Sequence, residues 1–332
     1  MWDKKPKRNY SAAFVSIFSA AIILAAAAGL YFNRQWIIDE VNFLSYKPST
    51  EMASFVEKSS MNDQGKFLFY SAKPSLQNSS EFNISCPSYS TTMAILGCYD
   101  GQKIYIYNIT DPQLNGIRDE TAAYEMLHAA YVRLSKSDRA NLDALIEKEY
   151  AKQSNTDTEA SVQYFAKYEP GDRDNELFSV IATQFKTIDP ALEKYYSRYF
   201  NDRQKLVSLY ETYSSVFTTL ENQAGDLYKQ VNTKSDQVRA DTADYNQKNT
   251  QLNADIATFN QKAQSGQLTQ STYVSQKASL EARISALQAE QVAINKEIQD
   301  LNDLVAQYNA LNVQFQKLNQ SINSSVAPTP SL

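Results

Sequence analysis

Residues 120–134 read ETAAYEMLHAAYVRL, a segment that follows a strand-rich stretch and precedes a helix-rich one. Its apolar residues recur at steps of three and four, which places them on one face of a helix: Ala123, Leu127, Ala130 and Leu134. The pattern predicts an amphipathic helix, beginning near Asp119, that packs against a protein core. The same helix carries Glu125 and His128, the only histidine in the chain.

The residues before this helix have the pattern of short strands. Residues 66–71 (KFLFYS) predict one strand, and residues 93–99 (MAILGCY) and 102–109 (QKIYIYNI) predict two more. The last two flank Asp100 and Gly101, a pair that favours a two-residue hairpin turn. In residues 102–109 isoleucines alternate with tyrosines, so we expect the two kinds of side chain on opposite faces of the sheet.

Helical patterns surround these strands. Residues 50–61 predict a helix with Thr50 as its N-cap, and another begins at Ser137. Further helices are expected at 158–168, 173–187 and 190–200. A small sheet combined with several helices is an α+β arrangement. We therefore expect residues 33–200 to form one globular α+β domain.

Two short motifs in this region resemble a known family. Residues 124–128 (YEMLH) resemble the H-E-x-x-H helix of zincin metallopeptidases, with a tyrosine in place of the first histidine. In the intact motif both histidines bind zinc, and the glutamate is the general base for the attacking water. Residues 175–179 (NELFS) resemble the N-E-x-x-S segment of the glutamate-type zincins, whose glutamate is the third ligand. The resemblance covers about residues 66–200 and implies a zincin-like fold.

The resemblance implies a role for each matching residue. His128 stands at the second ligand and Glu176 at the third, Glu125 stands at the general base, and Tyr124 replaces the first ligand. A catalytic zinc site ordinarily has three protein ligands. Gln184 and Glu169 are weak substitutes, since an amide is a poor zinc ligand and no pattern fixes either residue there.

We therefore expect a degenerate peptidase domain without a cofactor. One alternative is a zinc peptidase with an altered ligand set, which would consist of His128, Glu176 and Tyr124. The other is that His128 is a structural residue of the core, as lone helical histidines usually are.

The N-terminus has the pattern of a membrane anchor. Residues 1–9 carry four basic residues against one aspartate, and Tyr10–Phe32 then runs without a charge. About 20 apolar residues cross a bilayer core, and preceding basic residues stay in the cytoplasm. We expect a single-pass anchor at residues 10–32, with a cytoplasmic tail and the rest of the chain outside the cytoplasm. The alternative is a cleaved signal peptide, with small residues for cleavage at 25–28.

Charge and cysteine content agree with an exported protein that binds no nucleic acid. The chain has a net charge of -5, whereas nucleic-acid-binding proteins typically have a basic surface. Outside the cytoplasm, the only two cysteines, Cys86 and Cys98, are expected to form a disulfide.

Residues 201–325 have the pattern of a long helical hairpin. Apolar residues recur at steps of three and four in two arms, on either side of Gly266, where the chain can reverse. Ser271 or Thr272 is expected to cap the returning helix. These arms predict an antiparallel coiled-coil hairpin, with parallel homodimerisation as the alternative. Residues 326–332 form a Ser/Pro tail, expected to be disordered.

These features favour a membrane-anchored, extracytoplasmic protein without catalytic activity. Its peptidase-like domain and coiled-coil hairpin would act as an envelope scaffold or bind another envelope or surface protein. An adaptor that activates a cell-wall hydrolase through the hairpin is a further possibility from the same layout.

Overall fold

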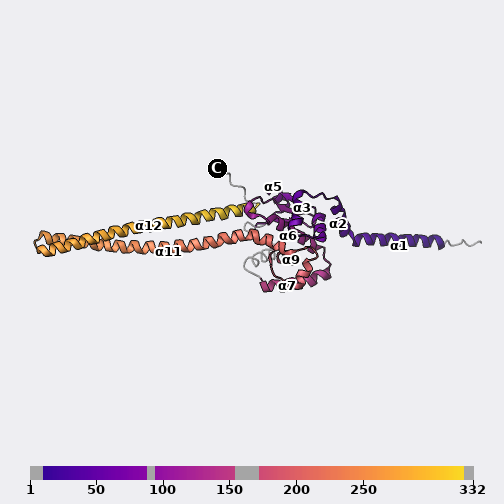
Figure 1. Ribbon diagram of the computed structural model, residues 1–332. Helices are drawn as coiled ribbons and strands as arrows, with labels where there is room; N and C mark the ends of the chain where they lie inside the picture. The colour runs from indigo at the N-terminus through magenta and orange to yellow at the C-terminus, as the bar shows by residue number, and fades with distance from the viewer. Residues whose placement is uncertain (1–9, 88–93, 154–171, 325–332) are drawn as a thin grey trace, which may run out of the picture. The chain divides into compact units, whose positions relative to one another are not determined.

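The computed structural model describes residues 10–87, 94–153 and 172–324, with the backbone alone for residues 10–17. The chain is mostly helical, with one small sheet (Figure 1). It divides into two compact units, Met1–Ser214 with Gln320–Leu332, and Ser215–Asn319. We call the first the globular unit and the second the hairpin unit.

The globular unit contains most of the elements. Its helices, given with the 3-10 helix η1, are α1 (Tyr10–Phe32), α2 (Arg34–Ser45), α3 (Thr50–Lys58), α4 (Asp63–Ser71), α5 (Ser79–Ser85), η1 (Pro112–Leu114), α6 (Ile117–Val132), α7 (Lys136–Gln153), α9 (Arg173–Gln184) and α10 (Pro190–Tyr196). Its strands are β1 (Ser75–Gln77), β2 (Gly97–Tyr99) and β3 (Ile104–Tyr107). The predicted combination of a small sheet and several helices is therefore confirmed.

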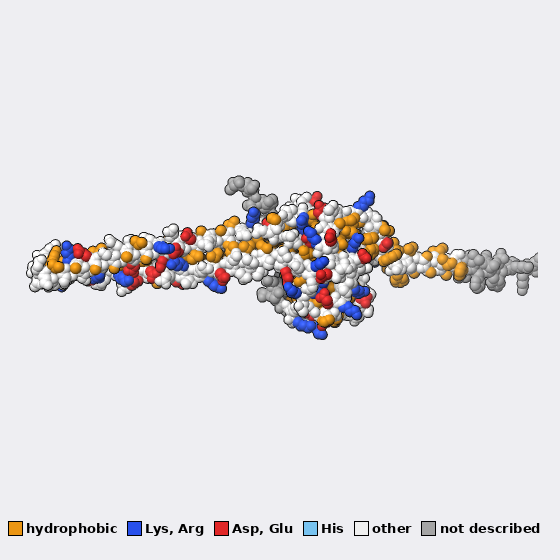
Figure 2. Space-filling view, in the orientation of Figure 1, with side chains coloured by type: hydrophobic (Ala, Val, Ile, Leu, Met, Phe, Trp, Pro, Cys, Tyr) orange, Lys and Arg blue, Asp and Glu red, His pale blue; other side chains and the backbone are white. Residues whose placement is uncertain are grey.

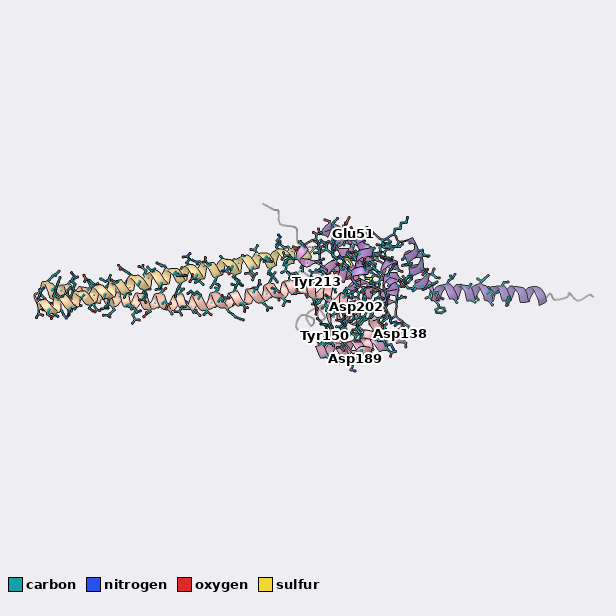
Figure 3. The ribbon with its side chains drawn as sticks, in the orientation of Figure 1. Glu51, Asp138, Tyr150, Asp189, Asp202 and Tyr213 are labelled. Carbon is teal, nitrogen blue, oxygen red and sulfur yellow. A yellow bond between two sulfur atoms is a disulfide. The ribbon has the colours of Figure 1, made fainter. Side chains whose placement is uncertain are left out.

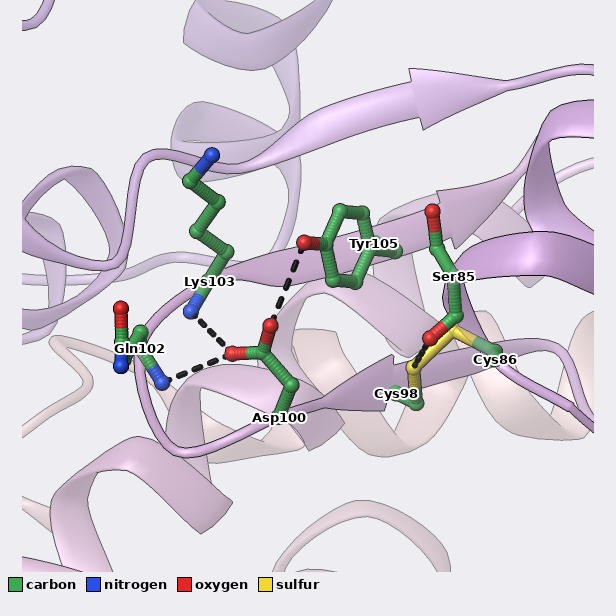
Figure 4. Close-up of a disulfide and its surroundings, with 7 residues drawn as sticks. All are labelled: Ser85, Cys86, Cys98, Asp100, Gln102, Lys103 and Tyr105. Carbon is green, nitrogen blue, oxygen red and sulfur yellow. Dashed lines mark hydrogen bonds between the residues drawn. A yellow bond between two sulfur atoms is a disulfide. The ribbon is translucent and has the colours of Figure 1, made fainter.

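The sheet has the strand order β1-β3-β2, so β2 is an edge strand. β3 pairs in parallel with β1 and antiparallel with β2, in the register Tyr99↔Ile104. The predicted hairpin is thus confirmed, but its connection comprises the four residues 100–103 rather than two. Asp100 stabilises this turn by accepting hydrogen bonds from the backbone N–H groups of Gln102 and Lys103 (Figure 4). The isoleucines of β3 are fully buried and the tyrosines are not, as the alternation predicts.

A disulfide joins the end of α5 to β2. Cys86 and Cys98 are bonded, as predicted (Figure 4). The bond closes a loop with a sequence separation of 12 residues. By loop-closure entropy, such a bond stabilises the folded chain by about 3 kcal/mol.

The core of the globular unit lies around α6 and α9, which pack against each other. On α9 every side chain from Asn175 to Thr183 is buried. Phe178 is its largest apolar member and stacks on Tyr196, whose hydroxyl donates a hydrogen bond to the carbonyl of Phe178. Arg203, at the start of α11 (Arg203–Gln264), donates to the carbonyls of Ala182 and Phe185. These bonds satisfy carbonyls at the C-terminal end of α9, which otherwise have no helical partner.

The prediction of a strand at 66–71 was wrong, because these residues belong to α4. The Asn62 side chain caps this helix by accepting hydrogen bonds from the N–H groups of Gln64 and Gly65. Residues 68–71 are consecutively buried, so this run shows no helical period, although Lys66 before it is exposed. A short, fully apolar run does not distinguish a buried strand from a buried helix.

Several smaller expectations also changed. β1 and α5 were not predicted, and α3 is capped by Ser49, whose side chain accepts from the N–H of Met52, rather than by Thr50. β2 begins only at Gly97. Four predicted parts lie outside the described residues: Met93, the helix expected at 158–168, the tail at 1–9 and the C-terminal segment 325–332. Helices expected at 173–187 and 190–200 are observed in shortened form as α9 and α10.

The hairpin unit consists of the greater part of α11 and of α12 (Gln270–Ile322). Aromatic contacts pair early residues of one helix with late residues of the other: Phe217 with Phe315, Tyr228 with Tyr308, and Phe259 with Tyr273. The helices therefore run antiparallel within one chain. Gly266 has a positive φ of 70° in the connection, where the chain was expected to reverse. The cap of α12 is Thr269, which accepts from the N–H of Thr272, rather than Ser271 or Thr272.

The N-terminal helix α1 has the bounds expected of the anchor. Among the described residues from Phe18 onward, no single helix is both long and apolar enough to cross a membrane. Phe18–Phe32 and α2 meet this requirement only as a pair that is bent by 64°.

Candidate functional site

Helices α6 and α9 carry all the residues that the zincin resemblance singles out. Their side chains meet in antiparallel order, so that His128 lies opposite Asn175 and Tyr124 lies opposite Glu176 and Ser179. The Ser179 hydroxyl donates a hydrogen bond of 3.2 Å to the carbonyl of Tyr124. This register places Tyr124, His128 and Glu176 in one cluster, which we call the YHE cluster.

The Tyr124 hydroxyl is hydrogen-bonded to the carboxylate of Glu176, which would be the third zinc ligand according to the resemblance. It donates a hydrogen bond of 2.6 Å to Oε2 of Glu176. Burial raises the pKa of Tyr124 well above its ordinary value, and the negative charge of Glu176 raises it further. The phenol is therefore neutral and is held as a hydrogen-bond donor.

His128 contacts the other oxygen of the same carboxylate. Its Nε2 lies 3.6 Å from Oε1 of Glu176, and its Nδ1 lies 3.0 Å from Oδ1 of Asn175. Burial alone lowers the pKa of His128, but the carboxylates of Glu176 and Glu125, with Asn175, outweigh burial, so the net direction is upward. A protonated imidazole donates from both nitrogens, which fits an acceptor oxygen at each.

Glu125 follows Tyr124 on α6, at the position that the zincin resemblance gives to the general base. It is buried, with 4 % of its surface exposed, and it lines a pocket of about 550 Å³ together with the YHE cluster. Edge strand β2 forms another wall of this pocket. A Cβ atom at Gly97 would lie 2.8 Å from Oε1 of Glu125 and 2.7 Å from Cγ2 of Thr121, so only glycine lets β2 approach α6 this closely.

A second buried carboxyl, Glu120, lies one turn before Tyr124 in the same pocket. Tyr213, labelled in Figure 3, donates a hydrogen bond of 3.2 Å to its Oε2 from the start of α11. Burial raises the pKa of Glu120 to about 7, although Thr183 and Tyr213 act in the opposite direction. Glu120, Asn175 and Tyr213 were not predicted as site residues, although Asn175 begins the 175–179 motif. The only sequence signal for Glu120 is its position four residues before Tyr124, which is itself four residues before His128. This spacing places all three side chains on one face of α6.

The described residues do not fit an ordinary catalytic zinc site. Nowhere in residues 18–87, 94–153 and 172–324 do three His, Cys, Asp or Glu side chains come together as a metal site requires. Within the YHE cluster, Tyr124 and His128 both contact the carboxylate of Glu176. Of the two weak substitutes, Gln184 lines the pocket, while Glu169 lies outside the described residues.

The arrangement can therefore hold a ligand, but its polar groups are largely committed to one another. None of the protein-family models, curated proteins and solved structures compared with this chain matches it.

Proposed function

We propose that the chain is a membrane-anchored, extracytoplasmic protein whose peptidase-like domain is not catalytic and that it acts as an envelope scaffold or partner-binding module. The observation that supports the absence of catalysis is the 2.6 Å hydrogen bond from Tyr124 to Glu176. This bond places a neutral phenol, which donates a hydrogen bond, at the position of the first zinc ligand. It also occupies one carboxylate oxygen of Glu176, the residue at the position of the third ligand. Three free donor ligands are what a catalytic zinc site needs.

The retained pocket supports binding in place of hydrolysis. It combines a buried polar cluster with an edge strand, β2, which pairs on one side with β3. Extended peptides commonly bind by adding a strand to such an edge. An extended segment of another envelope protein is therefore the ligand class that this pocket suits.

The hairpin unit supplies the proposed partner-binding surface. On α12, Val292 and Val313 are 69 % and 64 % exposed, so both side chains are accessible to a partner although α12 is paired with α11. Figure 2 shows hydrophobic side chains along the hairpin unit. We propose that the coiled-coil pattern of the two helices provides a stable rod and that its outer apolar residues contact a partner protein.

Hydrolysis of a quenched fluorescent peptide library by the full chain in lipid nanodiscs tests the catalytic part. The matched control is Glu125→Gln, which removes the would-be base and preserves the size of the side chain. We expect equal background rates for both proteins. Hydrolysis that disappears in Glu125→Gln would establish an active peptidase.

The partner-binding part is tested in cells with a photo-crosslinking residue at Val292 or at Val313. The control position is Ile84 on α5, which is 84 % exposed and equally apolar but lies in the globular unit. We expect a discrete adduct from the hairpin positions alone. Recovery of a cell-wall hydrolase in that adduct would favour the adaptor, and equal labelling at all three positions would argue against a specific hairpin partner.

A zinc peptidase with an altered ligand set is the second candidate function. It is favoured by the presence of His128, Glu176 and Glu125 around one pocket. Zinc binding by the chain decides between the two.

A further inference from the structure

Helix α2 presents an apolar stripe that no other part of the described chain covers. Its members lie on one helical face: Ile38, Val41 and Leu44 are 51 %, 59 % and 74 % exposed. Trp36, in the first turn on the side of Phe43, is 61 % exposed. The acidic residues of α2 lie off this stripe, since Asp39 is buried and Glu40 is half-buried. We call Ile38, Val41 and Leu44 the α2 stripe.

The opposite face of α2 is fixed to the globular unit. Arg133, at the C-terminal end of α6, forms a two-pronged ion pair with Asp39, at 2.7 Å from Nε and 2.6 Å from Nη2. Phe43 packs its ring against Phe67 and Tyr70 of α4. The stripe therefore has a defined direction, away from the globular unit.

The position of α2 in the chain points to what covers the stripe. It begins after a single intervening residue, Asn33, from the uncharged helix α1, and the two are bent by 64°. Twelve residues at about 1.5 Å each give a helix of about 18 Å, which at this bend advances only about 8 Å along the α1 axis. The headgroup layer of one leaflet is about 5–8 Å thick.

From these observations we infer that α2 is an interfacial helix that seats the globular unit on the outer leaflet, with the α2 stripe in the headgroup and upper acyl region. If α1 crosses the bilayer, an advance of about 8 Å keeps most of the length of α2 within the headgroup layer and reaches the water only near its C-terminal end. The bulky globular unit occupies the water side of α2, so the stripe faces the lipid. Trp36 suits this depth because its ring combines an apolar body with an N–H donor, and Arg34 carries a positive charge toward lipid phosphates.

The inference rests on the proposed membrane anchor, and the test separates the two. The full chain is reconstituted in vesicles of phosphatidylcholine and phosphatidylglycerol, with Trp2 and Trp36 replaced by phenylalanine. A single tryptophan is introduced by Val41→Trp, Leu44→Trp, Ile22→Trp or Ile84→Trp. Quenching by lipids brominated at shallow or deep acyl positions then reports the depth of each tryptophan.

We expect the tryptophans at 41 and 44 to be quenched at least about twofold more than the one at 84, and more by shallow than by deep bromines. The tryptophan at 22, in the middle of α1, should be quenched most by deep bromines. Quenching of the tryptophan at 22 without quenching at 41 and 44 overturns the interfacial position of α2 and leaves the anchor intact. Absence of quenching at 22 overturns the anchor, and with it this inference. A concentration-dependent blue shift at 41 without bromolipid quenching would show that a second copy covers the stripe, which also overturns the proposal.

Discussion

The buried carboxyl of Glu120 gives the globular unit a pH-dependent stability that Glu120→Gln should remove. Burial raises its pKa in the folded chain from 4.5 to about 7. The unfolded chain therefore releases this proton near pH 4.5, whereas the folded chain keeps it until about pH 7. Stability from this group falls as the pH rises between these values and is constant above them. At 1.36 kcal/mol per pKa unit, the fall is about 3 kcal/mol.

Glutamine has the size and the hydrogen-bonding groups of a protonated glutamate but cannot ionise. We expect Glu120→Gln to match the wild type within about 1 kcal/mol at pH 4 and to be more stable by up to about 3 kcal/mol at pH 8. The assay is urea unfolding in mild detergent, followed by the fluorescence of Trp36 in a Trp2→Phe background, since α2 is part of the globular unit. Subtraction of the two curves cancels the titration of every other group.

The matched control is Glu57→Gln on α3, where the side chain is exposed. Its stability difference from the wild type should stay near zero at every pH. If Glu120→Gln differs from the wild type by the same amount at pH 4 and at pH 8, burial does not raise the pKa of Glu120, because its pKa is then equal in the folded and unfolded chains.

Three further predictions concern the site and the sheet. The single histidine resonance of the chain should titrate with a midpoint above 6.5, and Glu176→Gln should lower this midpoint because it removes the nearest carboxylate; an unchanged midpoint in NMR of ¹³C-histidine protein would exclude the ion pair. Replacing Cys86 and Cys98 together by serine should lower the free energy of unfolding by about 3 kcal/mol in denaturant titrations, and no loss would show that the disulfide contributes nothing. Gly97→Ala should destabilise the globular unit by about 1–3 kcal/mol, because the new Cβ meets Glu125 and Thr121, whereas Gly225→Ala, with open space around it on α11, should be neutral or slightly stabilising.

The sequence predicted those parts of the fold whose signals are local. The alternation of isoleucine and tyrosine in β3, the Asp100–Gly101 turn and the long helical periods of α11 and α12 each correspond to an observed element. The strand expected at 66–71 was wrong because the consecutively buried residues 68–71 show no helical period, and the Asn62 cap that starts the helix lies outside that segment.

The candidate site was predictable only as far as its motifs reach. Residues 124–128 and 175–179 identified the two helices that meet, and with them Tyr124 and Glu176. Tyr213 is distant in sequence and belongs to no motif, so its contact with Glu120 depends on how α11 packs on the core. The α2 stripe was not recognised either, because it shows only when Asp39 is known to be paired with Arg133.

We propose that Tyr124, at the position of the first zinc ligand in the zincin motif, acts as a hydrogen-bond donor to Glu176 and that the chain holds no catalytic zinc. The most direct measurement is the zinc content of the purified full chain after equilibration with zinc and dialysis, by elemental analysis. We predict that the wild type and Tyr124→Phe retain essentially no zinc, that Tyr124→His retains about one zinc per chain, and that adding Glu176→Gln to Tyr124→His removes it. One zinc per wild-type chain, lost in Glu176→Gln, would contradict the account.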